Sequence, residues 1–138
     1  MNHLTPRQAY DFLLAHPEAV FVDCRSEAEY FLVGHALVER PGEEPLRPHN
    51  ICWADELKYE VNPDFVEDVR QVAGDTDRPV VIICRSGRRS VSAGQALEAA
   101  GWREVHNVLE GFEGPLDEKF RRGTSAGWRH AGLPWEQL

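Results

Sequence analysis

The fold is decided by the stretch Val80-Val81-Ile82-Ile83-Cys84-Arg85-Ser86-Gly87-Arg88-Arg89-Ser90. Its first four residues are apolar and β-branched, a composition that predicts a short buried strand. A helical pattern begins at about Ser90, because small or apolar residues then recur on one side of a helix: Val91, Gly94, Leu97 and Ala100. A cysteine therefore stands between a strand and a helix, in a loop with one glycine and three arginines. This arrangement predicts an anion-binding site with a nucleophile at its base.

Cys84 is the candidate nucleophile. A free cysteine titrates near pH ~8.5, and only its thiolate reacts well. Backbone N–H groups that curl around the sulfur, together with the dipole of the following helix, would stabilise that anion. The loop arginines would hold an anionic substrate, and glycine permits the positive φ that a tight cradle needs. We therefore expect Cys84 to be catalytic and the substrate to be bound by Arg85, Ser86, Gly87, Arg88, Arg89 and Ser90.

The alternative reading of this loop is a buried cysteine at the end of a strand, followed by a basic surface turn. Three arginines so close to one cysteine favour the site, because a plain turn has no need of them. Cys24 and Cys52 are read as buried structural residues. A role for Cys52 in resolving an oxidised Cys84 would require the two to approach closely.

Strands alternate with helices through the rest of the chain. We expect strands at 20–23, 51–53, 80–83 and 105–108, and helices beginning near residues 5, 26, 62 and 90, with a short one at 126–130. Thr5-Pro6 with Gln8 predicts a capping box at the first helix. This alternation is typical of parallel βαβ units with helices on both faces of one sheet. Ligands of such sheets bind at the carboxyl ends of the strands, where Cys84 and Asp23 both lie.

Length and composition predict one domain, residues 1–138. The net charge of −8 argues against binding to nucleic acid or to an acidic membrane. No basic region followed by an apolar stretch opens the chain, and no apolar run approaches membrane-spanning length. The three cysteines are an odd number without a CxxC pair, so a disulfide framework and a zinc site are not expected. These features predict a cytoplasmic protein in a reducing compartment.

Three segments resemble the single-domain rhodaneses, a family of sulfurtransferases. Residues 84–89 are similar to the six-residue active-site loop of that family. Residues 22–35 contain Asp-Cys-Arg, then Glu-Tyr and Gly-His, and resemble its first signature. Residues 108–112 occupy the place of a Leu-x-Gly-Gly segment. The resemblance covers about residues 5–115 and leaves 116–138 as a C-terminal extension.

The resemblance implies a rhodanese-like three-layer sandwich, with a central, mainly parallel sheet of about five strands and helices on both faces. It implies that Cys84 takes a sulfane sulfur from a small anionic donor (thiosulfate or a persulfide) and passes it to a thiol or protein acceptor. No metal and no organic cofactor is implied. Asp23, Arg25 and His35 match family positions that hold neighbouring segments together rather than perform chemistry.

The chain departs from the family pattern at three places. Residues 36–50 form a longer, proline-rich insertion, and residues 116–138 exceed the minimal domain. Glu110 stands where the family often has the first glycine of its pair, which places a carboxylate near the expected pocket. Either of the two added segments would line the site or serve only in packing.

Two other functions remain open from the sequence. Phosphatases and arsenate reductases of related fold also place a cysteine in an anion cradle, but five residues separate their cysteine and arginine. Here four residues separate Cys84 from Arg89, and the shorter loop suits a single sulfur atom better than a tetrahedral oxyanion. The other alternative is a sulfur-relay or binding module without rapid turnover.

Overall fold

A five-stranded sheet runs through the middle of the computed structural model, which describes residues 1–138. Its strands are β1 (Asn2–Leu4), β2 (Val20–Asp23), β4 (His49–Asn50), β5 (Val80–Ile83) and β6 (Val105–Val108). They lie in the order β1-β6-β5-β2-β4, and every neighbouring pair is parallel. The predicted parallel sheet of about five strands is confirmed.

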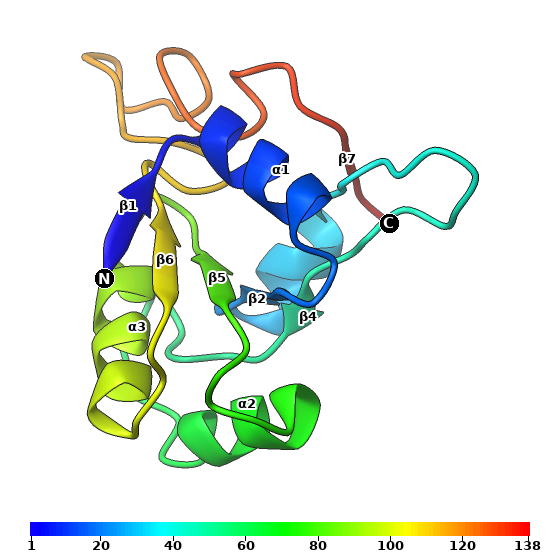
Figure 1. Cartoon of the computed structure of the whole chain (residues 1–138). Helices are drawn as coiled ribbons and strands as arrows, with labels where there is room; N and C mark the ends of the chain where they lie inside the picture. The colour runs from blue at the N-terminus through cyan, green and yellow to red at the C-terminus, as the bar shows by residue number, and fades with distance from the viewer.

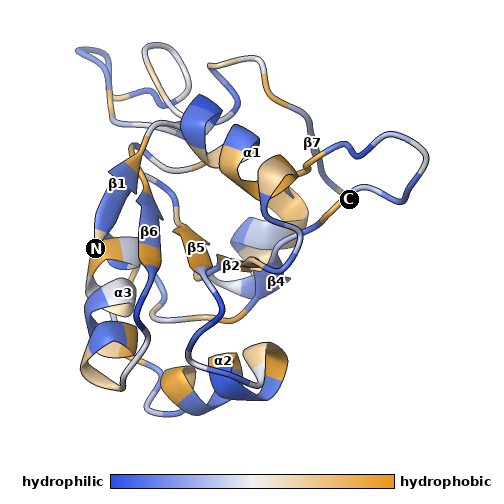
Figure 2. Ribbon diagram, viewed as in Figure 1, coloured by the Kyte–Doolittle hydropathy of each residue, from blue (hydrophilic) through white to orange (hydrophobic).

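Helices cover both faces of this sheet, with α1 (Pro6–Ala15) on one side and α2 (Phe65–Ala73) and α3 (Arg89–Ala99) on the other (Figure 1). Side chains alternate between the faces along each strand. Phe21, Val81 and Ile83 belong to the core under α1, whereas Val22 and Ile82 belong to the core under α2 and α3. Because β2 and β5 are buried on both faces, they read as continuous apolar runs, which Figure 2 shows as orange at β5.

The capping box predicted at the first helix is present. Thr5 Oγ1 accepts the backbone N–H of Gln8, and Gln8 Oε1 accepts that of Thr5. Ser26 and Glu29 make the same reciprocal pair at the next helical segment. That segment continues as η1 (Glu29–Val33), a turn of π-helix that ends at Gly34.

Several predicted boundaries are wrong. The strand expected at 51–53 forms at 49–50 instead, as β4. The N–H groups of Ile51 and Trp53 still donate to the carbonyls of Asp23 and Cys24, but residues 51–53 form no regular strand. The helix expected from residue 62 begins at Phe65, and residues 126–130 form turns instead of a helix. β1 was not predicted, because three residues at a sheet edge with two polar side chains carry little periodicity.

The C-terminal extension folds back onto the α1 side of the sheet, as the orange and red segments in Figure 1 show. Its strand β7 (Trp135–Glu136) pairs antiparallel with β3 (His35–Ala36). Trp128 is fully buried, with its ring against Tyr10 and Phe21. No helix has the length and apolar character needed to cross a membrane.

Candidate active site

Cys84 lies directly after β5, and α3 begins five residues later at Arg89. Its sulfur accepts the backbone N–H of Gly87 at 3.1 Å and that of Ser90 at 3.3 Å, and the hydroxyl of Ser90 lies at 3.2 Å. The N–H of Ser90 belongs to the first turn of α3, so the positive end of the helix dipole also faces the sulfur. The loop is therefore an anion-binding site whose N–H groups converge on a single sulfur atom.

The segment after β6 holds the loop in this shape. The backbone N–H groups of Phe112 and Glu113 donate to the carbonyls of Cys84 and Arg85 at 2.8 and 2.9 Å. The donors belong to a different segment of the chain, so the shape of the loop depends on residues outside it. Gly111 has φ +62°, and a Cβ there would overlap the carbonyl oxygen of Cys84, so only glycine fits.

The environment of Cys84 favours its thiolate. Burial raises its pKa, but hydrogen bonds from the Cys24 side chain and from the N–H groups of Ser90 and Gly87 outweigh burial, and the pKa falls to about 6. At neutral pH the sulfur is therefore mostly ionised, although its residue is 1% exposed. A buried thiolate of this kind is a strong candidate nucleophile.

Cys24 is the neighbour of Cys84 across the sheet. The register pairs Asp23 of β2 with Ile83 of β5, so the next residue of each strand is a cysteine on the same face. Burial and the adjacent Cys84 raise the pKa of Cys24 well above its usual value, which keeps it a thiol able to donate to the thiolate. The prediction that Cys24 is a small core residue holds for its burial, but the sequence did not predict its contact with the nucleophile.

A chain of hydrogen bonds leads away from the sulfur through the core. Beyond Cys84, Ser90 Oγ donates to Oδ1 of Asn107, a buried residue of β6. Asn107 Nδ2 lies 3.1 Å from Nδ1 of His3, which is exposed on the edge strand β1. The chain fixes the rotamer of Ser90 beside the sulfur and satisfies two buried polar side chains.

The three loop arginines have different surroundings. Arg89 is buried, and its guanidinium pairs bidentately with Glu29, with both N–O distances at 2.8 Å. Arg85 donates to Glu56 at 2.8 Å, and Arg88 is exposed without an ion pair. Binding of an anion by these three residues stays a prediction, and two of them already hold a carboxylate.

A cavity of about 410 Å³ lies beside Arg85, the residue after Cys84, although Cys84 itself does not line it. It is lined by Ser26, Ala28, Glu29, Val33, Asp55, Glu56, Leu57, Arg85 and Glu113. No residue of the insertion at 36–50 or of the extension at 116–138 lines it. Glu110, expected near the pocket, is exposed and does not line it either; its φ of +65° explains why glycine is usual at this position.

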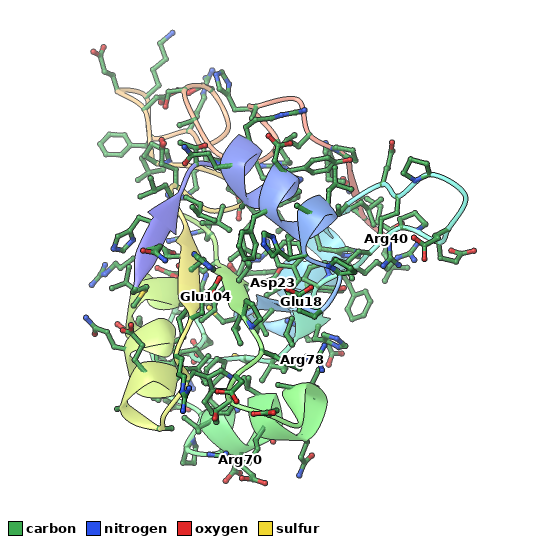
Figure 3. The ribbon with its side chains drawn as sticks, in the orientation of Figure 1. Glu18, Asp23, Arg40, Arg70, Arg78 and Glu104 are labelled. Carbon is green, nitrogen blue, oxygen red and sulfur yellow. The ribbon has the colours of Figure 1, made fainter.

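The buried pair of Asp23 and Arg25 braces the neighbouring segments. Arg25 Nη2 donates to Asp23 Oδ2 at 2.7 Å and to the carbonyl of Gly34 at 2.6 Å, so it links the end of β2 to the end of η1. Figure 3 shows Asp23 near the middle of the molecule. His35 bonds the carbonyl of Tyr30 and the carboxylate of Glu136. These contacts agree with the structural role that the sequence predicts.

Some residues of the site were not predicted. Glu56 lies in a stretch without regular structure, so no pattern indicated that it would meet two loop arginines. Glu29 was expected only as part of the Glu-Tyr pair in residues 22–35, without a contact to the loop. Cys52 is half-buried, burial raises its pKa, and no disulfide links the three cysteines. No cluster of three or more His, Cys, Asp or Glu side chains is arranged to hold a metal ion.

Comparison with known proteins agrees with this geometry. The family model described as Rhodanese-like domain matches residues 5–117. The chain is 30% identical to the thiosulfate sulfurtransferase GlpE of Pseudomonas fluorescens over 112 residues, which cover 81% of this chain and 82% of that protein. It is 26% identical to an uncharacterized protein of Rickettsia conorii over 137 residues, 99% of this chain and 98% of the other.

A solved structure with a similar fold is the crystal structure of Rv0390 from M. tuberculosis. It is 39% identical to this chain, with a TM-score of 0.85. The match covers 100% of this chain and 98% of that one, so it includes both the insertion and the C-terminal extension.

Proposed function

The chain belongs to the rhodanese-like domain family, and on that premise we propose that it is a sulfurtransferase in which Cys84 carries the transferred sulfur as a persulfide. The observation that carries the proposal is the buried sulfur of Cys84, with a pKa of about 6, inside a loop that points N–H groups at it. The similarity to the protein named thiosulfate sulfurtransferase GlpE supports the same reaction class.

Transfer takes two steps. The Cys84 thiolate attacks the outer sulfur of the donor; the bond from that sulfur to the rest of the donor breaks, and the electron pair leaves with the remainder, which is sulfite when the donor is thiosulfate. An acceptor thiolate, or cyanide in an assay, then attacks the outer sulfur of the persulfide. The electron pair of that bond returns to Cys84 as the thiolate.

The cradle suits this intermediate better than a phosphorylated or arsenylated cysteine. Gly87 and Ser90 already place their N–H groups within hydrogen-bond distance of one sulfur atom. In a phosphatase the loop arginine must face the bound oxyanion, whereas the buried guanidinium of Arg89 is held by Glu29 and Glu56. These contacts favour sulfur transfer over phosphoryl or arsenyl chemistry.

Steady-state turnover with thiosulfate and cyanide tests the proposal. We expect thiocyanate to form with parallel lines in double-reciprocal plots, the pattern of a covalent intermediate that exists between two half-reactions. Cys84→Ser should form none above the uncatalysed rate. Intersecting lines, or activity that survives Cys84→Ser, would overturn the proposed mechanism. One turnover followed by arrest would favour a relay module that needs its own acceptor protein.

A further inference from the structure

Glu56 neutralises the two arginines that would otherwise attract an anionic donor. One of its carboxylate oxygens accepts Arg85 Nη2 at 2.8 Å, and the other lies 2.7 Å from Arg89 Nε. Arg89 also holds Glu29, so its guanidinium serves two carboxylates and the carbonyl of Ala54. Two guanidinium groups and two carboxylates thus form one neutral cluster beside Cys84.

The cavity in front of this cluster has more carboxylates than guanidinium groups in its lining. Beyond the two carboxylates of the neutral cluster, its lining adds those of Asp55 and Glu113; Arg129 Nη2 lies 3.8 Å from Glu113, and no cation pairs with Asp55. Arg88, the one loop arginine without an ion pair, does not line it. A cleft lined mainly by one sign of charge lowers the local concentration of ligands of that sign and raises that of ligands of the opposite sign.

The same cavity has room and apolar surface for an organic group. Its volume of about 410 Å³ falls in the range of small-molecule sites. Ala28, Val33 and Leu57 supply apolar surface, and the Leu57 side chain has little other contact because the residue is 98% exposed. Thiosulfate carries two negative charges and has no organic group to place there.

We propose that the sulfur donor of this site is an organic hydropersulfide, R–S–SH, whose organic group is uncharged or cationic, and that Glu56 is the residue that discriminates against anionic donors. This inference rests on the proposed sulfurtransferase function and names the substrate class for it. The organic group occupies the cavity beside Arg85, and the outer sulfur reaches the loop N–H groups.

The chemistry balances without a further reactant. The Cys84 thiolate forms a bond to the outer sulfur of R–S–SH, and the S–S bond of the donor breaks. The electron pair leaves with the inner sulfur as R–S⁻, and the proton stays on the transferred sulfur. No net oxidation occurs, because one S–S bond replaces another.

Two donors that differ only in charge test the proposal. The hydropersulfides of cysteamine and of 3-mercaptopropionate have similar size, but one carries an ammonium and the other a carboxylate. We expect kcat/KM to be at least about tenfold higher for the cationic donor at low salt, and the preference to shrink as salt is added. Cys84→Ser supplies the rate of the uncatalysed reaction for subtraction.

Glu56→Gln should reduce this preference several-fold and raise kcat/KM for thiosulfate, because it removes one negative charge and releases Arg85. Glu67→Gln is the matched control: it makes the same chemical change on the exposed side of α2, where Glu67 pairs with Arg70, away from the cavity. Adding Arg85→Gln to Glu56→Gln should abolish most of the gain with thiosulfate if that gain comes from Arg85.

The outcomes separate this inference from the function it rests on. Equal rates with both matched donors, or a preference that Glu56→Gln leaves unchanged, would overturn the inference while persulfide formation on Cys84 continued. Failure of every donor to load sulfur onto Cys84 would overturn the proposed function itself. Circular dichroism and the unfolding midpoint of Glu56→Gln establish that a changed preference comes from a folded protein.

Discussion

The reactivity of Cys84 depends on two opposing effects on the pKa of its sulfur, burial and hydrogen bonding. Burial disfavours the charged thiolate, and the Cys24 side chain and the backbone N–H groups of Ser90 and Gly87 stabilise it. Two of these donors are backbone N–H groups, whose positions depend only on the path of the loop. The nucleophile is therefore activated without a histidine base.

The rate of Cys84 alkylation should follow the thiolate fraction. Because the pKa is lowered to about 6, the rate should rise as pH increases through about 6 and level off above it, well below the pH at which a free thiol reacts. Iodoacetamide labelling across pH 4–9, read by intact mass, measures this. Cys84→Ser corrects for labelling of Cys52, and a midpoint near ~8.5 would contradict the account.

Replacing Cys24 with alanine should raise the pKa of Cys84, because the thiolate loses one of its hydrogen-bond donors. A hydrogen bond to a charged group has a net worth that corresponds to a shift of about one pH unit. The same alkylation profile measures the shift. Cys52→Ala is the matched control and should leave the midpoint in place; equal midpoints for Cys24→Ala and the parent protein would show that Cys24 is only a core residue.

At this scale the sequence identified the nucleophile but not its neighbours. Cys84 was predictable because a thiol between an apolar run and a helix start, with three arginines beside it, is typical of an anion cradle. Cys24 and Glu56 were not, because their contacts depend on which strands are adjacent and on the path of an irregular loop. Such contacts between residues far apart in the chain have no local pattern.

At the scale of elements, β5, the loop and α3 form one unit that the segment after β6 supports. That segment donates N–H groups to two loop carbonyls, and Gly111 passes so close that no side chain fits. The unit therefore depends on a glycine outside the loop as much as on Gly87 within it.

Gly111→Ala should distort the loop and abolish most sulfur transfer, because a Cβ would overlap the carbonyl of Cys84 in a backbone already at φ +62°. Gly101→Ala is the matched control: its φ is +105°, but no atom lies within 4 Å of the added carbon. We expect the control to lower the free energy of unfolding by about 1–3 kcal/mol and to keep its activity. Urea unfolding and turnover measure both effects.

Equal loss of activity in the Gly101 and Gly111 variants would contradict the supporting role of this segment.

The elements themselves could be predicted where the pattern was strong: β2, β5 and β6 are apolar runs, and α1 has its capping box. β3, β4 and β7 have two residues each, too few for any periodicity. They exist because tertiary contacts hold them, and sequence patterns do not carry that information.

At the scale of the whole molecule, the C-terminal extension is part of the core under α1 and does not line the active-site cavity. Glu136 links the extension to the N-terminal half of the chain, because its carboxylate contacts both His35 and Arg47. Hydrogen bonds from Arg47 and His35 lower the pKa of Glu136 to about 2, with Arg47 the larger cause. The extension is therefore tied to the fold by an ion-pair network as well as by its buried apolar side chains.

Trp128→Ala should destabilise the protein strongly, by about 3–5 kcal/mol, because the indole is fully buried and its removal leaves a cavity beside Phe21. Trp135→Ala is the matched control, since Trp135 is 40% exposed and should cost much less. The free energy of unfolding from urea titration measures both. Similar losses for the two variants would show that the extension is not anchored through Trp128.

The fold class could be predicted because alternating strands and helices allow few arrangements. The strand order, with β1 at one edge and β4 at the other, could not, since both edge strands are short and partly polar. The edge strand β1 also brings His3 to the end of the hydrogen-bond chain from Cys84. No feature of the N-terminal sequence indicated that connection.

The intact mass of the protein after incubation with a sulfur donor tests the central claim most directly. The account predicts a gain of one sulfur atom that requires Cys84, is absent in Cys84→Ser, and disappears when cyanide is added, with release of thiocyanate. Peptide mapping should place the added sulfur on Cys84 rather than on Cys24 or Cys52. A folded protein that gains no sulfur from thiosulfate or from any hydropersulfide would contradict the account.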